Sequence, residues 1–236
     1  MPIKAVLFDL DGTLLPMDQD VFITTYFNRI AEHMTQYGYE PKELISAIWS
    51  GTAAMIKNDG FMTNEEAFWN ACKKVYGDKI IEDIPHFDEF YATKFDTVSE
   101  VCGKNPKAAA IVHELKSKGY RVILATNPLF PTVATKSRIR WVGLEPEDFE
   151  YFTTYENSSY CKPNLAYYQA ILDKSGLDAS ECLMVGNDVG DDMVTSELGM
   201  KVFLLMDCLI NKHNTDISAY PNGNIDDLFE FIEALE

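Results

Sequence analysis

The stretch Phe8-Asp9-Leu10-Asp11-Gly12-Thr13-Leu14-Leu15 decides what the rest of the chain is expected to form. It follows an apolar, β-rich run that begins at Ile3, so two carboxylates lie where a buried strand opens into a turn. Asp9 and Asp11 are two residues apart, which directs both side chains to the same side of an extended chain. Gly12 permits a tight turn. Like charges at a buried strand end require a cation between them or a proton on one of them, so the stretch predicts a metal site.

Size and composition are those of a globular protein. The chain has 236 residues, of which 47% are hydrophobic and 24% charged, enough for one large domain or two modest ones. The formal net charge of −17 makes nucleic acids and anionic membrane surfaces poor partners. It also repels a phosphorylated substrate at long range, so any anion site must be local and assisted by a metal ion.

Cysteine usage and the start of the chain indicate the compartment. The five cysteines are odd in number, widely spaced and free of CxxC pairs, which favours a reducing compartment and gives no zinc site. The N-terminus shows no signal peptide pattern, and no apolar run approaches the ~20 residues that span a bilayer. We therefore expect a cytoplasmic protein.

Residues between about Asp18 and Phe95 carry apolar side chains at helical spacing and no strand-like run. The pattern predicts helices at 18–37, 41–57, 63–76 and 79–96. Thr63 and Glu66 form a capping box at the start of the third, and Pro85 interrupts the fourth. This part of the chain is expected to be a small all-helical unit.

After Asn105-Pro106 strands and helices alternate. The expected strands are 121–125, 149–155, 182–186 and 201–206, and the expected helices are 107–118, 131–140, 164–175, 190–198 and 225–235. This alternation predicts an α/β fold with a doubly wound parallel sheet, in which ligands bind beyond the carboxyl ends of the strands. The helical unit follows the first strand directly, so it emerges at that edge and is placed to act as a lid.

Polar residues follow three of the later strands. They are Thr126 and Asn127 before Pro128, Lys162 before Pro163, and the run Gly186-Asn187-Asp188-Val189-Gly190-Asp191-Asp192. Each has an ordinary structural explanation: a turn, a solvated lysine, or acids favoured at a helix N-terminus. Their convergence with Asp9 and Asp11 at one edge of the sheet favours a site instead. Carboxylate oxygens without nearby His or Cys select Mg²⁺.

With these motifs in place, the chain resembles the haloacid dehalogenase superfamily, in its phosphatase branch. Asp9-Leu10-Asp11-Gly12-Thr13 is similar to the first motif of that family, Thr126 to the second, Lys162 to the third, and Gly186 to Asp192 to the fourth. The resemblance implies a Rossmann-like catalytic core, residues 1–15 and 98–236, with a helical cap domain inserted at 16–97. It covers the whole chain.

The resemblance also implies a mechanism. Asp9 would attack phosphorus and form an aspartyl-phosphate, while Asp11 would act as general acid and then as general base. Mg²⁺ would be held by Asp9, the backbone carbonyl of Asp11 and Asp188, with Asp192 bound directly or through a water molecule. Thr126, Asn127 and Lys162 would bind the phosphate of a small-molecule ester. Asp11 favours phosphatases over dehalogenases, which lack this second Asp.

Several alternatives stay open. In the fourth motif Asn187 rather than Asp188 is one possible principal metal ligand, and Asp191 is an alternative to Asp192. A phosphosugar mutase or a non-catalytic binding protein would share the same motifs. In the cap, Trp49, Met55, Phe61 and Trp69 are expected to be core residues. Arg138 and Arg140 are expected on a solvated helix face, from which either could reach an acidic partner. The substrate and the oligomeric state are not predicted.

Overall fold

The computed structural model describes residues 2–234. Their strands form one parallel sheet with the order β3-β2-β1-β4-β5-β6. The strands are β1 (Ala5–Phe8), β2 (Arg121–Leu124), β3 (Tyr151–Phe152), β4 (Cys182–Gly186), β5 (Lys201–Leu205) and β6 (Asn222–Gly223). The predicted parallel α/β sheet is therefore confirmed.

The register of the central strands brings the sequence motifs to one edge. Phe8, at the end of β1, pairs with Leu124 of β2 and with Val185 of β4. The residues that follow these strands therefore lie side by side at the carboxyl edge of the sheet. This is where the sequence predicted a site.

Helices cover both faces of the sheet, because successive side chains of a strand point to opposite faces. In β1, Val6 and Phe8 face the apolar cluster that includes α6 (Pro106–Ser117), α7 (Thr132–Trp141) and α9 (Ile225–Glu233). Ala5 and Leu7 face the cluster that includes α8 (Leu165–Ser175). The four residues of β1 are all buried, as expected for a central strand of a doubly wound sheet.

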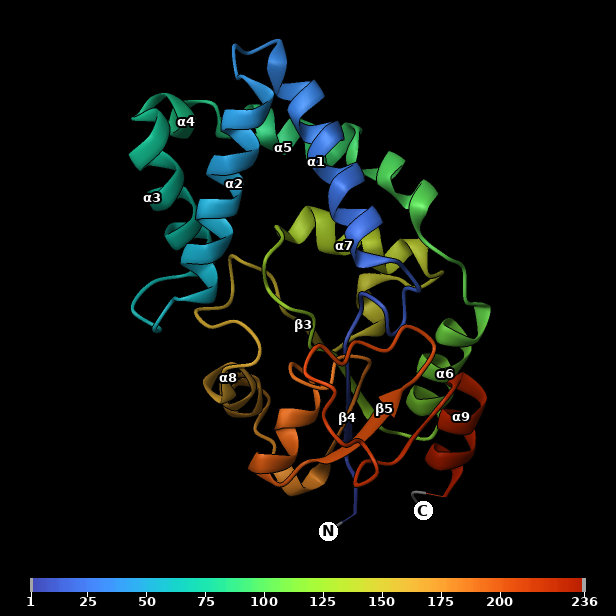
Figure 1. Cartoon of the computed structure of the whole chain (residues 1–236). Helices are drawn as coiled ribbons and strands as arrows, with labels where there is room; N and C mark the ends of the chain where they lie inside the picture. The colour runs from blue at the N-terminus through green and yellow to red at the C-terminus, as the bar shows by residue number, and fades with distance from the viewer. Residues whose placement is uncertain (1, 235–236) are drawn as a thin grey trace.

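Five helices between β1 and β2 lie together at the carboxyl edge of the sheet, at the top of Figure 1. They are α1 (Gln19–Thr35), α2 (Pro41–Ile56), α3 (Asn64–Tyr76), α4 (Lys79–Glu82) and α5 (Ile84–Thr93), and the 3₁₀ helix η1 (Phe95–Val101) follows them. The predicted capping box of α3 is present, with Glu66 N–H donating to Thr63 Oγ1 at 3.1 Å. The expected division of the chain at 15/16 and 97/98 stays a prediction.

The two segments that connect these helices to the sheet run side by side. Met17 forms an antiparallel bridge with Cys102, and Gly103 N–H donates to the Pro16 carbonyl oxygen at 2.7 Å. Pro16 is five residues beyond Asp11, so this paired linker begins next to the turn that carries the second carboxylate.

Several expected elements differ in detail. The predicted helix at 190–198 is the 3₁₀ helix η4 (Met193–Leu198), and the predicted strand at 149–155 is reduced to the two residues of β3. The fourth predicted helix is divided, because Pro85 occupies the first turn of α5 and starts a new helix there. β6 was not expected from the sequence. Of the predicted helix 225–235, Leu235 lies outside the described residues. Within residues 2–234, no helix has the length and apolar character to cross a membrane.

Candidate active site

A cavity of about 390 Å³ opens at the carboxyl edge of the sheet. Its walls come from the loops after β1, β2, β3, β4 and β5 and from α1 and α2. The structure brings the sequence-predicted site residues together on these walls: Asp9, Asp11, Thr126, Asn127, Lys162, Asn187, Asp188, Asp191 and Asp192. The predicted convergence of these residues at one edge of the sheet is therefore present in the structure.

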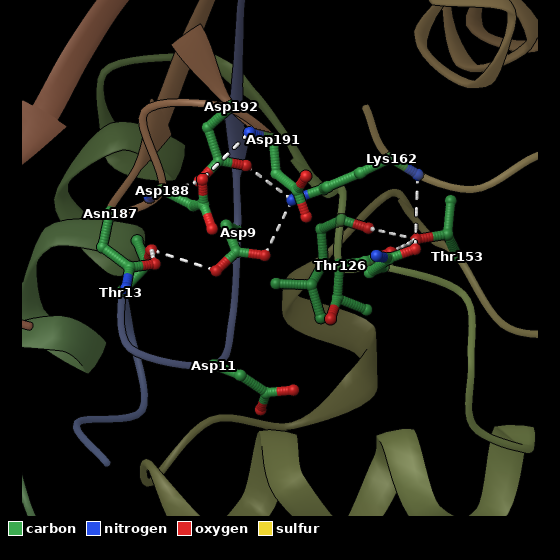
Figure 2. A network of polar contacts seen from close by, with 12 residues as sticks. Asp9, Asp11, Thr13, Thr126, Thr153, Lys162, Asn187, Asp188, Asp191 and Asp192 are labelled. Carbon is green, nitrogen blue, oxygen red and sulfur yellow. Dashed lines mark hydrogen bonds and ion pairs between the residues drawn. The ribbon is translucent and has the colours of Figure 1, made fainter. Parts of the chain in front are cut away.

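Lys162 is a buried cation held between two carboxylates. Its Nζ donates to Asp9 Oδ1 at 2.8 Å and to Asp192 Oδ1 at 2.7 Å, as Figure 2 shows. Burial alone would lower the pKa of Lys162, but the charges of Asp192 and Asp9 outweigh it and hold the pKa well above its usual range. Lys162 therefore stays protonated and offsets the charge of Asp9.

The carboxylate of Asp192 is buried and accepts a hydrogen bond from Lys162. Its Oδ1 accepts from Lys162, and its Oδ2 accepts from Asp188 N–H at 3.1 Å. Burial raises the pKa of Asp192 to about 7, against the opposing effect of the Lys162 ammonium. Gly186 is required beneath it, because a Cβ at Gly186 would overlap the Asp192 carboxylate.

The second oxygen of Asp9 is fixed by a polar chain that the sequence did not reveal. The Thr13 hydroxyl lies 3.1 Å from Asp9 Oδ2 and 3.0 Å from Asn187 Oδ1, so it can donate to either one. Asn187 Nδ2 in turn donates to the Cys208 carbonyl oxygen at 2.7 Å. Gly12 fits into this arrangement with φ of 91°, where a Cβ would overlap the Asn187 amide.

Thr126 offers an unused hydroxyl at the tip of β2. Its Oγ1 is buried and has no hydrogen-bond partner within residues 2–234, although Thr126 lines the cavity. The carbonyl oxygen of Thr126 is fixed from behind by Thr153 Oγ1 at 2.6 Å and by the Tyr167 hydroxyl at 2.8 Å. Next to it, Asn127 Oδ1 accepts from Lys162 N–H at 3.3 Å. The backbone of Thr126 is therefore held rigidly, and its hydroxyl is a buried, unpartnered donor beside the cavity.

Asp11 has a partner that corrects the sequence prediction. Arg138, expected on a solvated helix face, is fully buried on α7 and pairs with Asp11 through Nη1 and Oδ2. Its guanidinium also donates to Thr135 Oγ1 at 3.2 Å and lies 4.5 Å from the centre of the Phe130 ring. The buried residues of α7 include Ala134, Thr135, Arg138 and Ile139, whose helical spacing was the signal available in the sequence.

The environment of Asp11 suits proton transfer. Burial raises the pKa of Asp11, and the charge of Asp9 adds to this effect, whereas Arg138 opposes it. Asp11 Oδ1 is buried without a hydrogen-bond partner in the described chain. Asp11 therefore keeps one oxygen free while Arg138 fixes the other.

The oxygen donors at the tip of β4 fit a hard divalent cation. Asp188 and Asp191 line the cavity, and neither forms an ion pair with another residue of the described range. Burial raises the pKa of Asp191, and the charge of Asp188 raises it further. Asp188 Oδ1 accepts from Gly190 and Asp191 N–H groups at 2.8 and 3.0 Å, which leaves its Oδ2 free.

Side chains alone do not enclose an ion in residues 2–234, where no group of three Asp, Glu, His or Cys side chains is placed to hold one. Magnesium-like ions commonly use one or two carboxylates and complete their shell with water and substrate oxygens. The donor set is compatible with such an ion.

The helices α1 to α5 contribute further to the site. The buried Asn64, at the start of α3, donates to the carbonyl oxygens of Pro128 and Tyr160 at 3.3 Å each, which fastens this helix to the loops beside Thr126 and Lys162. Nothing in the sequence singled out this asparagine.

The four cap residues that were expected in the core behave differently from one another. Met55 and Trp69 are buried as expected. That prediction is wrong for Trp49 and Phe61, which are 47% and 90% exposed.

Comparisons with known proteins agree with this geometry. The pyrophosphatase PpaX of Bacillus velezensis is 23% identical over 199 residues, which cover 84% of this chain and 81% of that protein. The glyceraldehyde 3-phosphate phosphatase of Methanocaldococcus jannaschii is 24% identical over 252 residues, which cover 99% of both chains. The crystal structure of a HAD phosphatase from Thermococcus onnurineus shares the fold, with a TM-score of 0.61, 17% identity and 98% of each chain covered.

A family profile gives the most extensive evidence. The profile of the haloacid dehalogenase-like hydrolases matches residues 3–194, which include every candidate residue described above. The order of the motifs along the chain and their meeting at one edge of the sheet agree with that match. The chain belongs to the haloacid dehalogenase-like hydrolase family.

Proposed function

We propose that this hydrolase is a Mg²⁺-dependent phosphatase that cleaves a small-molecule phosphate monoester through an aspartyl-phosphate on Asp9. The observation that carries the proposal is the pairing of Asp9 with the buried Lys162 beside the unpartnered hydroxyl of Thr126. A nucleophilic carboxylate, a fixed cation and a free donor in one cavity are what an entering phosphate requires. Two of the relatives named above are phosphatases of small phosphate compounds by name, which supports the same class.

Binding and orientation follow from the contacts of the site. A phosphate oxygen placed beside Thr126 would accept from Oγ1, and a second one would lie near the Lys162 ammonium. Lys162 keeps its position because Asp192 holds it from the side away from Asp9. Lys162 donates to Oδ1 of Asp9 and Thr13 can donate to Oδ2, so these contacts restrict the rotation of the carboxylate that would attack phosphorus.

Asp9 would then attack phosphorus while the bond to the ester oxygen breaks. Asp11, in its protonated form, would give its proton to the leaving alkoxide from Oδ1. In the second half, Asp11 would take a proton from the water that attacks the aspartyl-phosphate, which releases inorganic phosphate and restores both carboxyl groups. Burial raises the pKa of Asp11, which favours the protonated form that the first step requires.

The proposed metal ligands are Asp9, the main-chain carbonyl of Asp11, and Asp188. Asp191 is the better fourth candidate than Asp192, because both oxygens of Asp192 already accept hydrogen bonds. When bound, Mg²⁺ would offset the charge of the phosphate and of the nucleophile.

Residues 16–97 are proposed to act as a cap over this chemistry. Met17, Gln19, Phe22, Ile23 and Ile56 come from this segment and form part of the cavity wall. The helices that carry them lie over the strand ends (Figure 1), so they are placed to exclude water from the aspartyl-phosphate.

The test is release of inorganic phosphate from an aryl phosphate in the presence of Mg²⁺. Asp9→Asn should lower the rate by at least ~10³-fold, because it removes the nucleophile. Asp178→Asn is the matched control, since Asp178 is exposed and its side chain makes no capping hydrogen bond. Mass spectrometry of acid-quenched enzyme should find one added phosphoryl group on the peptide that contains Asp9.

A chelator should also stop turnover, with thermal unfolding measured in parallel because metal ions also stabilise folded proteins. Full activity of Asp9→Asn would contradict the nucleophile. Isomerisation of a sugar phosphate in excess of phosphate release would indicate a mutase instead.

A further inference from the structure

A second cavity lies next to the first and has a different character. It measures about 110 Å³ and lies between the helices α1, α2, α3 and α5 and the loop after β2. Its walls are mainly aromatic and aliphatic, and include Tyr26, Trp49, Trp69 and Tyr91. None of its lining residues is charged, whereas the first cavity is lined by carboxylates and lysines.

The two cavities share part of their walls. Ile23 on α1, and Leu129 and Phe130 in the loop after β2, line both of them. Phe130 is held in place by the Arg138 guanidinium on one side and packs against Tyr26 on the other, with 5.3 Å between the ring centres. A group attached to a phosphate at Asp9 and directed toward the helices would meet Ile23, Leu129 and Phe130, and would reach the aromatic cavity once these side chains move aside.

The aromatic cavity offers few hydrogen-bonding groups to a ligand that carries several hydroxyls. The Tyr26 and Tyr91 hydroxyls bond to each other at 2.7 Å. Trp69 Nε1 is a buried donor without a partner in the described chain and could serve one ligand oxygen, and the hydroxyls of Thr52 and Tyr155 also line the cavity. These few groups cannot satisfy the several hydroxyls of a sugar, and burying unsatisfied hydroxyls or a second charged group is costly.

We propose that the substrate is the phosphate monoester of an apolar alcohol, and that its short alkyl chain or single ring occupies this aromatic cavity. The inference rests on the proposed phosphatase function and names the class of ester that the function serves. The size agrees, because an apolar cavity of about 150 Å³ admits benzene, so about 110 Å³ suits a slim ring or a chain of a few carbons.

The experiment compares alkyl phosphates whose leaving groups are chemically similar. Phosphate release is measured for ethyl, butyl, 3-methylbutyl and hexyl phosphate and for glycerol 1-phosphate as the polar ester of comparable size. We expect kcat/KM to rise about fourfold for each methylene that enters the cavity, and to level off when the cavity is full. Glycerol 1-phosphate should fall well below butyl phosphate.

A cavity-filling variant gives a second readout. Thr52 lines the aromatic cavity on α2, and Thr52→Phe would fill it. The ratio of kcat/KM for butyl over ethyl phosphate should then fall toward one. Ser50→Phe is the matched control, because Ser50 is exposed on the same helix and its hydroxyl, like that of Thr52, bonds to the carbonyl four residues before it. In this control the ratio should stay as in the natural chain.

The outcomes separate the two proposals. Hydrolysis of all the esters with a flat chain-length profile, or a preference for glycerol 1-phosphate, would overturn the apolar substrate and leave the phosphatase in place. Loss of the ratio in Ser50→Phe as well as in Thr52→Phe would also overturn it. No phosphate release from any ester would overturn the phosphatase and this inference together. If Thr52→Phe does not fold, the chain-length series with the natural chain decides alone.

Discussion

Replacing Arg138 with Met tests whether the buried ion pair with Asp11 holds the site together. Arg138 has 1% of its side chain exposed and Asp11 has 21%. Removing one partner of a buried pair costs about 3–5 kcal/mol, because the other charge is left uncompensated. Because Asp11 is partly exposed, the cost should lie at the lower end of this range. We therefore expect the free energy of unfolding to fall by about 3 kcal/mol. For a chain of this size this corresponds to a fall in Tm of about 6–12 °C.

A double-mutant cycle with Asp11→Asn isolates the interaction, measured by urea unfolding at pH 7. Each single variant leaves an unpaired buried charge, whereas the double variant leaves no charge at either position, so its loss should be smaller than the sum of the two single losses. Arg140→Met is the matched control two residues along α7. Arg140 pairs with Glu145 at the surface, at 3.0 Å, and its loss should cost less than about 1 kcal/mol.

Two results would refute the reasoning. One is a loss in Arg138→Met no larger than that in Arg140→Met. The other is additivity of the single variants within about 0.5 kcal/mol, which would show that the two charges do not depend on each other.

Three further substitutions probe the turn after β1, the cap attachment and the pH dependence. Gly12→Ala should cost about 1–3 kcal/mol in urea unfolding, because φ of 91° is strained for alanine and its Cβ would displace Asn187; an unchanged stability would contradict this. Asn64→Ala should cost about 1–3 kcal/mol by leaving core carbonyls unpaired, and proteolysis between α2 and α3 should become faster; equal cleavage rates would count against the attachment. Hydrogen bonding from Lys79 lowers the pKa of Asp83, so its stabilisation is present above the unfolded pKa and is lost as pH falls below it. Asp83→Asn should therefore cost up to about 1 kcal/mol at pH 7 and progressively less as the pH falls below the unfolded pKa of about 3.9, and a cost that does not change with pH would contradict this.

The fold was predictable from the sequence because its signals are local. The apolar run of β1 and the alternation after Pro106 gave the parallel sheet, and the register of Phe8 with Leu124 and Val185 brought the expected motifs together. The short strand β3 and the 3₁₀ helix η4 were less predictable, since backbone hydrogen bonding to distant segments sets their limits.

Site residues could be predicted from the sequence only where the residue type and its place after a strand together indicate a chemical role. Asp9 and Lys162 were expected to meet, and they lie 2.8 Å apart. Arg138 was assigned to solvent because a basic run on a helix is usually exposed, and its burial depends on Asp11, which is distant in the sequence. Asp192 accepts hydrogen bonds from Lys162 and from the Asp188 backbone N–H. The contact with Lys162 could not be read from the sequence either, because it joins residues that only the fold brings together.

The paired linkers at Met17 and Cys102 have a mechanical consequence. Two separate linker segments would allow the helices α1 to α5 to rotate about several axes. Two linkers that are hydrogen-bonded to each other bend together, which favours rotation about a single hinge axis. The pivot then lies close to Leu15, which bridges back to Asp11 across the turn. Asp11, the proposed proton donor, would therefore lie almost on the axis, where an opening to admit a substrate would shift it least, while the aromatic walls far from the pivot would move furthest.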